Sequence, residues 1–322
     1  MPLSTIYEPI QGDLVKVEDK LRSVCEVSSP WLSTLLEHSL RNGGKRIRPA
    51  LVLLSGRSHN YDLSCLLPMA IAVEVLHTAT LVHDDAIDHS PVRRGRPTIN
   101  KVWGEDKAIL LGDYLLAKAE ELASDTQNLR VIRLFAQTIM TISSGELSQA
   151  FSAFNLEQTR EHYLERIASK TASLFSLATE SGAILSQAPE KLVKALREYG
   201  YNLGIAFQIM DDILDFIGDE AEMGKPTGSD LAQGTLTLPA MLLLERYPND
   251  NPITRVFQNQ GDKQENIKLA IELVRQSSII EECYKVASVY CSKACRNLRL
   301  ISDDASRHSL KELASYVVAR RK

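Results

Sequence analysis

Apolar residues recur at spacings of three and four positions along almost the whole chain, and this periodicity predicts amphipathic helices. Alternating strand-like runs joined by Asn-Gly or Asp-Gly turns are nearly absent. Four long segments carry the helical pattern clearly: residues 31–42, 68–88, 107–125 and 190–219. The pattern therefore predicts an all-α protein.

The stretches between such segments predict loops at residues 56–62, 220–235 and 246–266, which are rich in Gly, Pro or polar residues. No change of composition marks a domain boundary, and no repeat of fixed period runs along the sequence. With 322 residues and 44% hydrophobic content, the chain is long enough to bury a large core. We predict that residues 1–322 form a single helical domain.

The overall charge excludes several classes of protein. The chain has 37 Lys and Arg against 41 Asp and Glu, so we expect no broad positive surface for nucleic acid or an anionic membrane. The N-terminus lacks the basic and apolar regions of a secretory signal, and no stretch approaches about eighteen uninterrupted apolar residues. We therefore expect a soluble, cytoplasmic protein without a stable membrane anchor.

Negative charge is concentrated in two aspartate motifs within predicted helices: residues 84–88 read DDAID, and residues 211–215 read DDILD. In each motif the first and last aspartates are one helical turn apart and lie on the same face. Carboxylates that close together repel, raise one another's pKa and destabilise the helix. Mg²⁺ would relieve this repulsion, because it binds oxygen ligands and leaves room for water and phosphate oxygens.

A single motif of this kind can also be an ordinary solvated helix end. Its repetition favours a metal site, since two clusters facing each other across a helical bundle would hold several Mg²⁺ ions around one diphosphate. An EF-hand is excluded, because neither segment has the alternating aspartates and the glycine of that loop. The sequence therefore predicts a site for a polyanion bound through metal ions.

Basic residues near these motifs could bind the same polyanion. Two arginines follow the first motif in a segment flanked by Pro and Gly, and residues 42–49, NGGKRIRP, place three more cations where a helix boundary leaves backbone amides unpaired. In chain order, these cations are Lys45, Arg46, Arg48, Arg93 and Arg94. Arginine suits bidentate phosphate recognition and lysine supplies a point charge. The alternative is an ordinary solvated helix start; a P-loop is excluded because GxxxxGK[ST] is missing.

Seven segments in this order resemble the trans-isoprenyl diphosphate synthase family, also called polyprenyl synthetases. They are GGKRIRP (43–49), LVHDDAIDHSPVRRG (81–95), GDYLLAKA (112–119), GELSQ (145–149), SKT (169–171), FQIMDDILD (207–215) and GKPTGSDL (224–231). The resemblance spans nearly the whole chain. It implies an all-helical bundle of the isoprenoid synthase type with a central substrate cavity, and a prenyltransferase related to hepta-, octa- or solanesyl diphosphate synthases.

The resemblance also implies roles for individual residues. With substrate bound, roughly three Mg²⁺ ions would be held by Asp84, Asp85, Asp88, Asp211, Asp212 and Asp215. The allylic diphosphate would be bound by Arg93, Lys170 and Lys225, with Thr171 and Gln208 near the developing carbocation. The pocket for isopentenyl diphosphate would consist of Lys45, Arg48, His77 and Arg94.

The charge layout implies a mechanism. Metal ions and cationic side chains would stabilise the departing diphosphate, so that the allylic C–O bond ionises and the double bond of isopentenyl diphosphate attacks the carbocation. No protein nucleophile is needed, and the released diphosphate would take up the proton. Apolar helix walls would exclude water, which would otherwise react with the cation.

One departure from the family lies at residues 234–239, which read GTLTLP where the family commonly has GKxTLP. Thr235 replaces the second lysine and removes one charge from the diphosphate site. Because Arg93, Lys170 and Lys225 remain, we expect activity to survive with lower affinity for phosphate.

The length of the product can be argued from the helix that leads into Asp84. In the family, positions four, five, eight and eleven before the first aspartate face the growing prenyl chain, and here they are Thr80, Ala79, Leu76 and Val73. Short-chain members carry Phe or Tyr at the first two positions, whereas both are small here. One isoprene unit covers roughly one helical turn, about 5 Å, so we predict a medium- or long-chain product for a quinone side chain. The alternatives are that small residues merely allow close helix packing, and that the product is geranylgeranyl or farnesyl diphosphate.

Three rival functions share some of these features. A class I terpene cyclase usually has an Asn/Ser/Glu pattern as its second metal motif, and a head-to-head condensing enzyme lacks the complete isopentenyl pocket. A non-catalytic regulatory subunit would have no reason to keep two repulsive aspartate clusters. The resemblance implies a homodimer, and the basic C-terminus, residues 319–322, is interpreted as a solvated tail rather than a closing segment.

Overall fold

The computed structural model describes residues 1–322 except 42, 219–225, 303 and 320–322, and nearly all of its regular structure is helical. The N-terminal half contains α1 (Leu3–Ile6), the short 3-10 helix η1 (Glu8–Ile10), α2 (Gln11–Val24), α3 (Pro30–Leu40), α4 (Ile47–Gly56), α5 (Leu63–Ile87), α6 (Ile99–Trp103), α7 (Glu105–Ser124) and α8 (Leu129–Phe151). A two-residue hairpin, β1 (Val92–Arg93) and β2 (Arg96–Pro97), follows α5. The predicted all-α fold is confirmed.

The C-terminal half continues in the same way. It contains α9 (Arg160–Ile167), a π-helical turn η2 (Ala168–Ala172), α10 (Ser173–Leu185), α11 (Glu190–Ile217), α13 (Ser229–Ala232), α14 (Leu238–Arg246), α15 (Pro252–Phe257), α16 (Lys263–Gln276), α17 (Ile279–Asn297), the 3-10 turn η3 (Leu298–Leu300) and α18 (Ala305–Ala319). The four long predicted segments all form helices, with ends within a few residues of those expected except at the start of α5.

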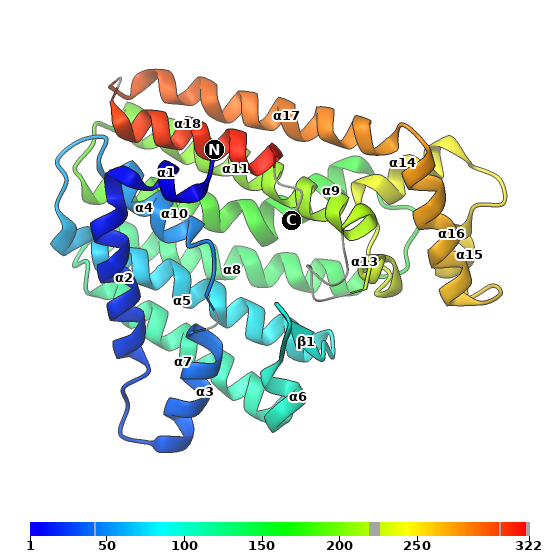
Figure 1. Cartoon of the computed structure of the whole chain (residues 1–322), viewed down its shortest axis with the longest axis horizontal. Helices are drawn as coiled ribbons and strands as arrows, with labels where there is room; N and C mark the ends of the chain where they lie inside the picture. Colours follow the sequence, from blue (N-terminus) through cyan, green and yellow to red (C-terminus); the bar gives the residue numbers. More distant parts are fainter. Residues whose placement is uncertain (42, 219–225, 303, 320–322) are drawn as a thin grey trace.

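The long helices form a bundle. In Figure 1 the helices α5, α8, α10, α11 and α17 run along the long axis of the molecule, while α14, α15 and α16 lie together at one end. Helix α5 packs on α4 and α7, α10 packs on α4, α8 and α11, and α11 packs on α17. The buried apolar side chains form one cluster that extends from the N-terminal helices to α18. The prediction that residues 1–322 form a single domain stays a prediction.

Three expectations about loops and helix boundaries were wrong. Within the described part of the predicted loop at residues 220–235, Ser229–Ala232 form the short helix α13. Residues 246–266 were predicted to be a loop but include α15, because Asn251 accepts a hydrogen bond from the backbone N–H of Ile253 and Pro252 occupies the first helical position. Helix α5 starts at Leu63 rather than near residue 68, since Asp62 caps it through the N–H of Ser64. Pro68 therefore lies inside the helix, where its ring removes one backbone hydrogen bond. The starts of α15 and α5 are set by local capping rather than by apolar periodicity.

Helix α5 is apolar on all sides. Within the described part of the chain it is the one helix long and apolar enough to cross a membrane, judged by length and composition. However, 61% of its most apolar stretch is buried inside the protein, and the core helices of soluble proteins pass the same test. Its neighbours in the bundle provide the apolar surroundings that its composition requires.

Glycines allow the helices that carry the predicted site to approach closely. A Cβ on Gly204 of α11 would lie 2.5 Å from the Cα of Ala172 in η2, and a Cβ on Gly112 of α7 would lie 2.1 Å from Nε2 of His83 in α5. Both distances are too short for any larger residue without movement. The first approach brings Gln208, one turn beyond Gly204, opposite η2, and the second holds α7 against the end of α5.

Candidate active site

The first aspartate motif lies at the C-terminal end of α5, with Asp88 as the capping residue. The hairpin β1–β2 returns Arg93 to this end, where its Nε lies 2.8 Å from both carboxylate oxygens of Asp85. Asp85 is only 6% exposed. Burial raises the pKa of the Asp85 carboxyl, although the Arg93 guanidinium opposes this shift. Asp85 is therefore held by a charged partner, whereas the side chains of Asp84 and Asp88 have more contact with solvent.

The second motif lies inside α11, and its central aspartate is almost fully buried. Asp212 accepts one hydrogen bond from the hydroxyl of Tyr163, at 2.6 Å, and one from Nε2 of Gln208, at 2.9 Å. Burial raises the pKa of Asp212 to about 7, and the charge of Asp230 adds to this effect. Burial also raises the pKa of Tyr163 well above its usual value, so its hydroxyl stays protonated and donates.

Asp215, at the end of the second motif, also contacts protein donors. Its oxygens accept a hydrogen bond from the hydroxyl of Ser229, at 2.8 Å, and one from the backbone N–H of Asp230, at 3.3 Å. Its backbone carbonyl accepts from the N–H of Gly228, at 2.8 Å. Asp215 thereby joins the end of α11 to the start of α13, while Asp211 is half-buried one turn earlier.

The predicted lysine and polar residues of the SKT motif connect the two aspartate motifs. Lys170 lies in the π-helical turn η2, with its Nζ 2.9 Å from Oε2 of Glu146 in α8 and 3.8 Å from Oδ2 of Asp84. Burial lowers the pKa of Lys170, but Asp84 and Glu146 outweigh burial and leave it raised, so the ammonium persists. The hydroxyl of Thr171 donates to Oε1 of Gln208 at 2.6 Å. In the turn η2, Lys170 thus lies near the first motif, and the next residue, Thr171, is joined to the second motif through Gln208.

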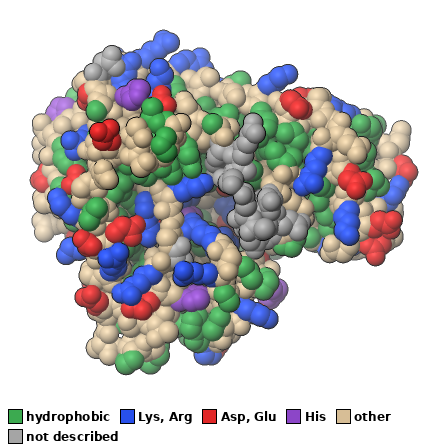
Figure 2. Space-filling model, viewed as in Figure 1, with side chains coloured by type: hydrophobic (Ala, Val, Ile, Leu, Met, Phe, Trp, Pro, Cys, Tyr) green, Lys and Arg blue, Asp and Glu red, His purple; other side chains and the backbone are tan. Residues whose placement is uncertain are grey.

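A basic pocket borders the first motif. Its lining includes Arg46, His77, Arg93 and Arg94, of which sequence analysis assigned His77 and Arg94 to the isopentenyl site. Figure 2 shows Lys and Arg side chains around a hollow in the middle of one face of the molecule. Burial, followed by the charges of the surrounding arginines, lowers the pKa of His77 well below its usual value, so His77 is neutral here.

The two other predicted residues of that site lie on aromatic rings. Nζ of Lys45 is 5.6 Å from the ring centroid of Tyr316, and Cζ of Arg48 is 5.0 Å from that of Phe175. Neither is among the described residues that line the basic pocket. Lys45 and Arg48 are close in sequence to Arg46, which lines the pocket. Their predicted role in binding isopentenyl diphosphate stays a prediction.

Three polar residues of the site, Tyr163, Glu146 and Ser229, were not predicted from the sequence, and a fourth was noted without a role. Glu146 stands in the GELSQ motif, which was noted without a function for its carboxylate. Tyr163 had no motif to mark it, although it precedes Lys170 by seven residues and so lies on a similar side of a helix. Arg46 was noted as a cation, and its Nη1 lies 2.7 Å from Oε1 of the buried Glu74, which holds it at the pocket wall.

Of the two positions singled out at the allylic diphosphate site for the lysine that the family has there, Lys225 lies outside the described residues. Thr235, which replaces the family's second lysine, is half-buried, and its backbone N–H donates to the carbonyl of Asp230 at 2.8 Å. The carbonyl of Asp230 thus accepts a hydrogen bond from Thr235, and the N–H of Asp230 donates one to Asp215. These bonds hold the segment against the second motif without a lysine.

The predicted chain-length residues lie together on α5. Val73, Leu76 and Ala79 are each at most 1% exposed, and the hydroxyl of Thr80 donates to the backbone carbonyl of His77 at 2.8 Å. Thr80 therefore presents its methyl group and no unpaired donor along this face. Three of the four residues are buried in the apolar interior and Thr80 is half-buried, and their effect on product length stays a prediction.

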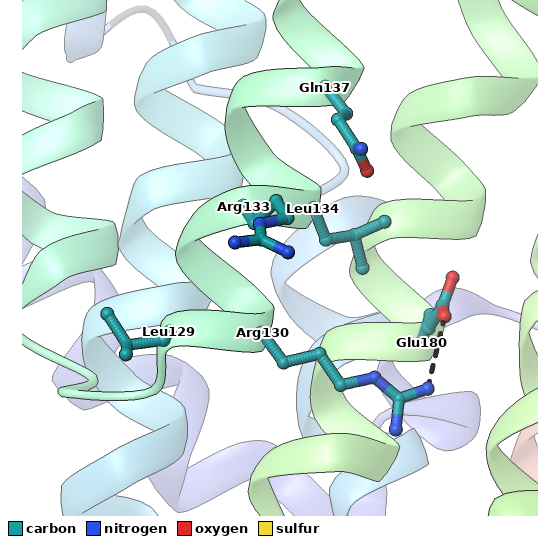
Figure 3. A pocket seen from close by; sticks show the side chains of 6 residues that line it. All are labelled: Leu129, Arg130, Arg133, Leu134, Gln137 and Glu180. Carbon is teal, nitrogen blue, oxygen red and sulfur yellow. Dashed lines mark ion pairs between the residues drawn. The ribbon is translucent and has the colours of Figure 1, made fainter.

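A second pocket lies away from these residues, between α8 and α10. Figure 3 shows Arg130 of α8 reaching toward Glu180 of α10, and Nη2 of Arg130 lies 3.8 Å from Oε1 of Glu180. Arg130 also pairs with Glu190, with Nη1 2.7 Å from Oε2. On the same helix Glu146 is about 24 Å further along, so this pocket is separate from the aspartate motifs.

The donor set fits a hard divalent cation. Within the described residues, no three Asp, Glu, His or Cys side chains lie close enough together to hold a metal ion by themselves. The aspartates supply only oxygen donors, which suit Mg²⁺, and Mg²⁺ commonly completes its coordination with water and substrate phosphate oxygens. The residues therefore fit metal ions that bind together with a diphosphate.

An all-helical bundle with paired aspartate motifs beside a basic pocket is the architecture of an isoprenoid synthase. The sequence model of the Polyprenyl synthetase family matches residues 29–274, and the chain belongs to this family. The family predicted from the motifs is thus confirmed, and with it the class of enzyme, a prenyltransferase.

Individual relatives cover almost the full chain. Heptaprenyl diphosphate synthase component 2 of Bacillus subtilis is 38% identical over 321 residues, which are 100% of this chain and 92% of that protein. The crystal structure of heptaprenyl diphosphate synthase from Staphylococcus aureus is similar with a TM-score of 0.92 and 36% identity, covering 97% of this chain and 99% of that one. A polyprenyl synthase from Caulobacter crescentus, complexed with calcium and isoprenyl diphosphate, is similar with a TM-score of 0.95 and 32% identity, covering 100% and 98% of the two chains. These similarities favour a medium- or long-chain trans-prenyl synthase.

Proposed function

We propose that this protein condenses isopentenyl diphosphate head-to-tail, with trans geometry, onto an allylic diphosphate to make a polyprenyl diphosphate. The observation that carries the proposal is the position of η2 between the two aspartate motifs. Lys170 lies 3.8 Å from Asp84 of the first motif, and Thr171 contacts Gln208, which contacts Asp212 of the second. One diphosphate bound between the motifs would therefore meet a cation and, beside it, polar groups suited to the reacting carbon.

The aspartates divide into two groups in this proposal. Asp84, Asp88 and Asp211 supply oxygens to Mg²⁺, because their side chains have more access to solvent than the other three. Asp85, Asp212 and Asp215 already accept hydrogen bonds from protein donors and hold the ligand-bearing segments in place. When bound with substrate, roughly three Mg²⁺ ions would supply positive charge for the departing diphosphate.

Cationic side chains bind the two diphosphates. Arg93, Lys170 and Lys225 take the allylic diphosphate, and their charges favour the negative charge that develops on its bridging oxygen as the C–O bond breaks. His77 and Arg94 line the pocket for isopentenyl diphosphate. Lys45, just before α4, and Arg48, in the first turn of α4, would add charge to that pocket.

The rest of the reaction needs no protein nucleophile. The π-electrons of isopentenyl diphosphate form the new C–C bond to the allylic carbon, and the released diphosphate takes the proton that is lost. The hydroxyl oxygen of Thr171 and the amide of Gln208 stabilise the electron-poor carbon. The apolar side chains of the bundle exclude water from this carbon.

The growing chain extends along α5 in this proposal. Ala79 and Thr80 leave room beside the helix, and the path continues toward Leu76 and Val73. The product is then a long-chain polyprenyl diphosphate of the kind that becomes a quinone side chain. We further propose that residues 1–322 act as one domain and that the protein works in the cytoplasm.

A homodimer is the assembly that we propose. Helices α7 and α8 carry large apolar side chains on the surface: Ile109, Leu110, Met140, Leu147 and Phe151, the last 90% exposed. A second copy of the chain would cover them, as isologous interfaces bury self-complementary apolar patches. A Leu147→Glu and Phe151→Glu double variant should then run as a monomer in light scattering, whereas an unchanged dimer would place the interface elsewhere.

A second candidate is a catalytic subunit that needs a different partner chain. One relative is named as component 2 of heptaprenyl diphosphate synthase. In that case the apolar surface of α7 and α8 would be covered by a different protein, and the isolated chain would elongate no primer.

The decisive experiment uses the purified chain alone. It is incubated with labelled isopentenyl diphosphate, Mg²⁺ and, in parallel, dimethylallyl, geranyl, farnesyl or geranylgeranyl diphosphate, and the dephosphorylated products are sized. Linear products of roughly six or more isoprene units, each one helical turn long, would support the long-chain synthase. Linear products that stop at farnesyl or geranylgeranyl would favour the short-chain alternative, and cyclic products would favour a cyclase. No elongation with any primer would favour the subunit or regulatory alternatives.

A further inference from the structure

We propose that Tyr163 is a positioning residue that, through Asp212 and Gln208, fixes the direction in which the hydroxyl of Thr171 faces the reacting carbon. This inference rests on the proposed synthase function. It concerns a tyrosine that sequence analysis did not single out and that has no place in the mechanism above.

A continuous chain of hydrogen bonds carries the inference. The Tyr163 hydroxyl lies 2.6 Å from Oδ2 of Asp212, Oδ1 of Asp212 lies 2.9 Å from Nε2 of Gln208, and Oε1 of Gln208 lies 2.6 Å from Oγ1 of Thr171. Tyr163 is 1% exposed, and Asp212 is 2% exposed. Three helical elements, α9, α11 and η2, contribute to this chain, so its geometry depends on their packing.

The direction of the chain follows from which atoms can donate. The phenol of Tyr163 donates its one proton to Oδ2 of Asp212, and Nε2 of Gln208 donates to Oδ1, so both oxygens of this carboxyl group accept. The NH₂ group of Gln208 therefore faces Asp212, and its carbonyl oxygen faces Thr171. Thr171 must then donate its single proton to Gln208, which leaves the lone pairs of Oγ1 on the other side.

This polarity suits the reaction. When the allylic C–O bond breaks, its electron pair leaves with the diphosphate oxygen and the carbon becomes electron-poor. A hydroxyl that presents lone pairs stabilises this carbon, whereas one that presents its proton does not. Thr171 is adjacent to Lys170, which lies near Asp84, so its oxygen is close to the proposed diphosphate site.

The ring of Tyr163 is itself held in place. Cζ of Arg166 lies 5.6 Å from the ring centroid, and the guanidinium donates to Oε1 of Gln158 at 2.7 Å and to the carbonyl of Leu236 at 2.6 Å. Two hydrogen bonds thus hold Arg166 in place while its guanidinium lies over the ring. A fixed ring gives the hydroxyl one direction, which a positioning residue requires.

The chain offers a matched control for a test. Tyr199, on α11, is also fully buried, and its hydroxyl also donates a hydrogen bond of 2.6 Å, here to the backbone carbonyl of Leu310. Tyr163→Phe and Tyr199→Phe therefore remove the same hydroxyl group from two buried sites, together with a hydrogen bond of the same length. Only the first change reaches Gln208.

The two variants are compared with the unaltered protein for kcat, for the KM of each diphosphate, for the Mg²⁺ dependence and for thermal stability. We expect Tyr163→Phe to lower kcat by about tenfold, as supporting hydrogen bonds around an active site commonly do, with both KM values within about twofold. Tyr199→Phe should keep its kcat while losing a similar amount of thermal stability. Equal kcat in the two variants would overturn the inference, since Tyr163 would then have only a structural role.

A double-mutant cycle tests the route. Thr171→Val removes the end of the chain and should lower kcat, whereas Thr171→Ser keeps the hydroxyl and should restore most of it. If Tyr163 acts through Thr171, adding Tyr163→Phe to Thr171→Val should lower kcat no further. Effects that multiply would overturn the inference. If the unaltered protein elongates no primer, the proposed function fails and this inference fails with it, whereas normal elongation with equal variants removes only the inference.

Discussion

The two aspartate motifs have nearly the same sequence but different surroundings. The first ends a helix, so its last aspartate caps α5 and its central one, Asp85, pairs with the charged Arg93. The second lies inside α11, where its central aspartate, Asp212, accepts hydrogen bonds from two neutral donors, Tyr163 and Gln208. Spacing makes the motifs similar on a helix, whereas availability to a ligand depends on what the rest of the fold places against each carboxylate.

The comparison extends to the residues that precede each motif. Four positions before the first aspartate, α5 has Thr80, while α11 has Phe207, whose ring lies 5.0 Å from that of Phe175 between centroids. The α11 side is therefore filled by aromatic packing, and the α5 side carries small residues. This difference supports the proposal that a long apolar product extends along α5 rather than α11.

The largest effect should come from the first aspartate of each motif. We expect Asp84→Ala and Asp211→Ala each to lower the rate of elongation by about 10³-fold or more, because each removes a ligand for the charge that stabilises the departing diphosphate. Initial rates with labelled isopentenyl diphosphate measure this. Asp106→Ala, a change to an exposed aspartate paired with Lys107, serves as the control. Unchanged activity in either active-site variant would falsify the synthase function.

One substitution tests whether the growing chain extends along α5. Ala79→Tyr should stop elongation early, at about three or four isoprene units, because the ring would fill the space one turn beyond the aspartates. Chromatography of the dephosphorylated products gives the lengths. Ala79→Ser should leave the lengths unchanged, and long products from Ala79→Tyr would mean that the chain follows another route.

The role of the last aspartate separates the motifs further. Asp215→Asn should lower the free energy of unfolding by about 1–3 kcal/mol, since it disturbs the buried contacts with Ser229 and Asp230. Asp88→Asn, at the exposed matching position, should change stability much less. Denaturant titration of both variants measures this, and equal losses would contradict the division of the aspartates that we propose.

The central aspartate of the second motif should also make stability depend on pH. The pKa of Asp212 in the folded protein, about 7, lies above its ordinary value of 3.8, so folding favours its protonated form. This contribution to stability is fully present below about pH 4 and is lost as the pH rises through about 7. Because Asp212→Asn does not titrate, its melting temperature relative to the unaltered protein should be higher at pH 8 than at pH 5. Parallel curves over this range would show that burial does not raise this pKa.

The sequence predicted the helices well because apolar periodicity reports which face of each helix is buried. It failed at α15, where Asn251 and Pro252 are start signals within a polar segment. In the site, the aspartates, Lys170, Thr171 and Gln208 were predicted from motifs. The structure places Lys170 near Asp84 and joins Thr171, through Gln208, to Asp212. The partners Tyr163, Glu146 and Ser229 could not be assigned, since their contacts join positions that are 49, 24 and 14 residues apart in the chain.

The geometry of the site depends on the number of residues in the π-helical turn η2. Helices α9 and α10 continue one another through this wider turn, which includes Lys170 and Thr171. Deletion of Ala168 would allow regular α-helix but would rotate the residues on one side by about 100° relative to the other. Tyr163 and Thr171 could then no longer reach the same face of α11. Insertions and deletions in this short stretch should therefore be harder to tolerate than many substitutions, and they offer a way to test the site without changing the chemistry of any side chain that remains.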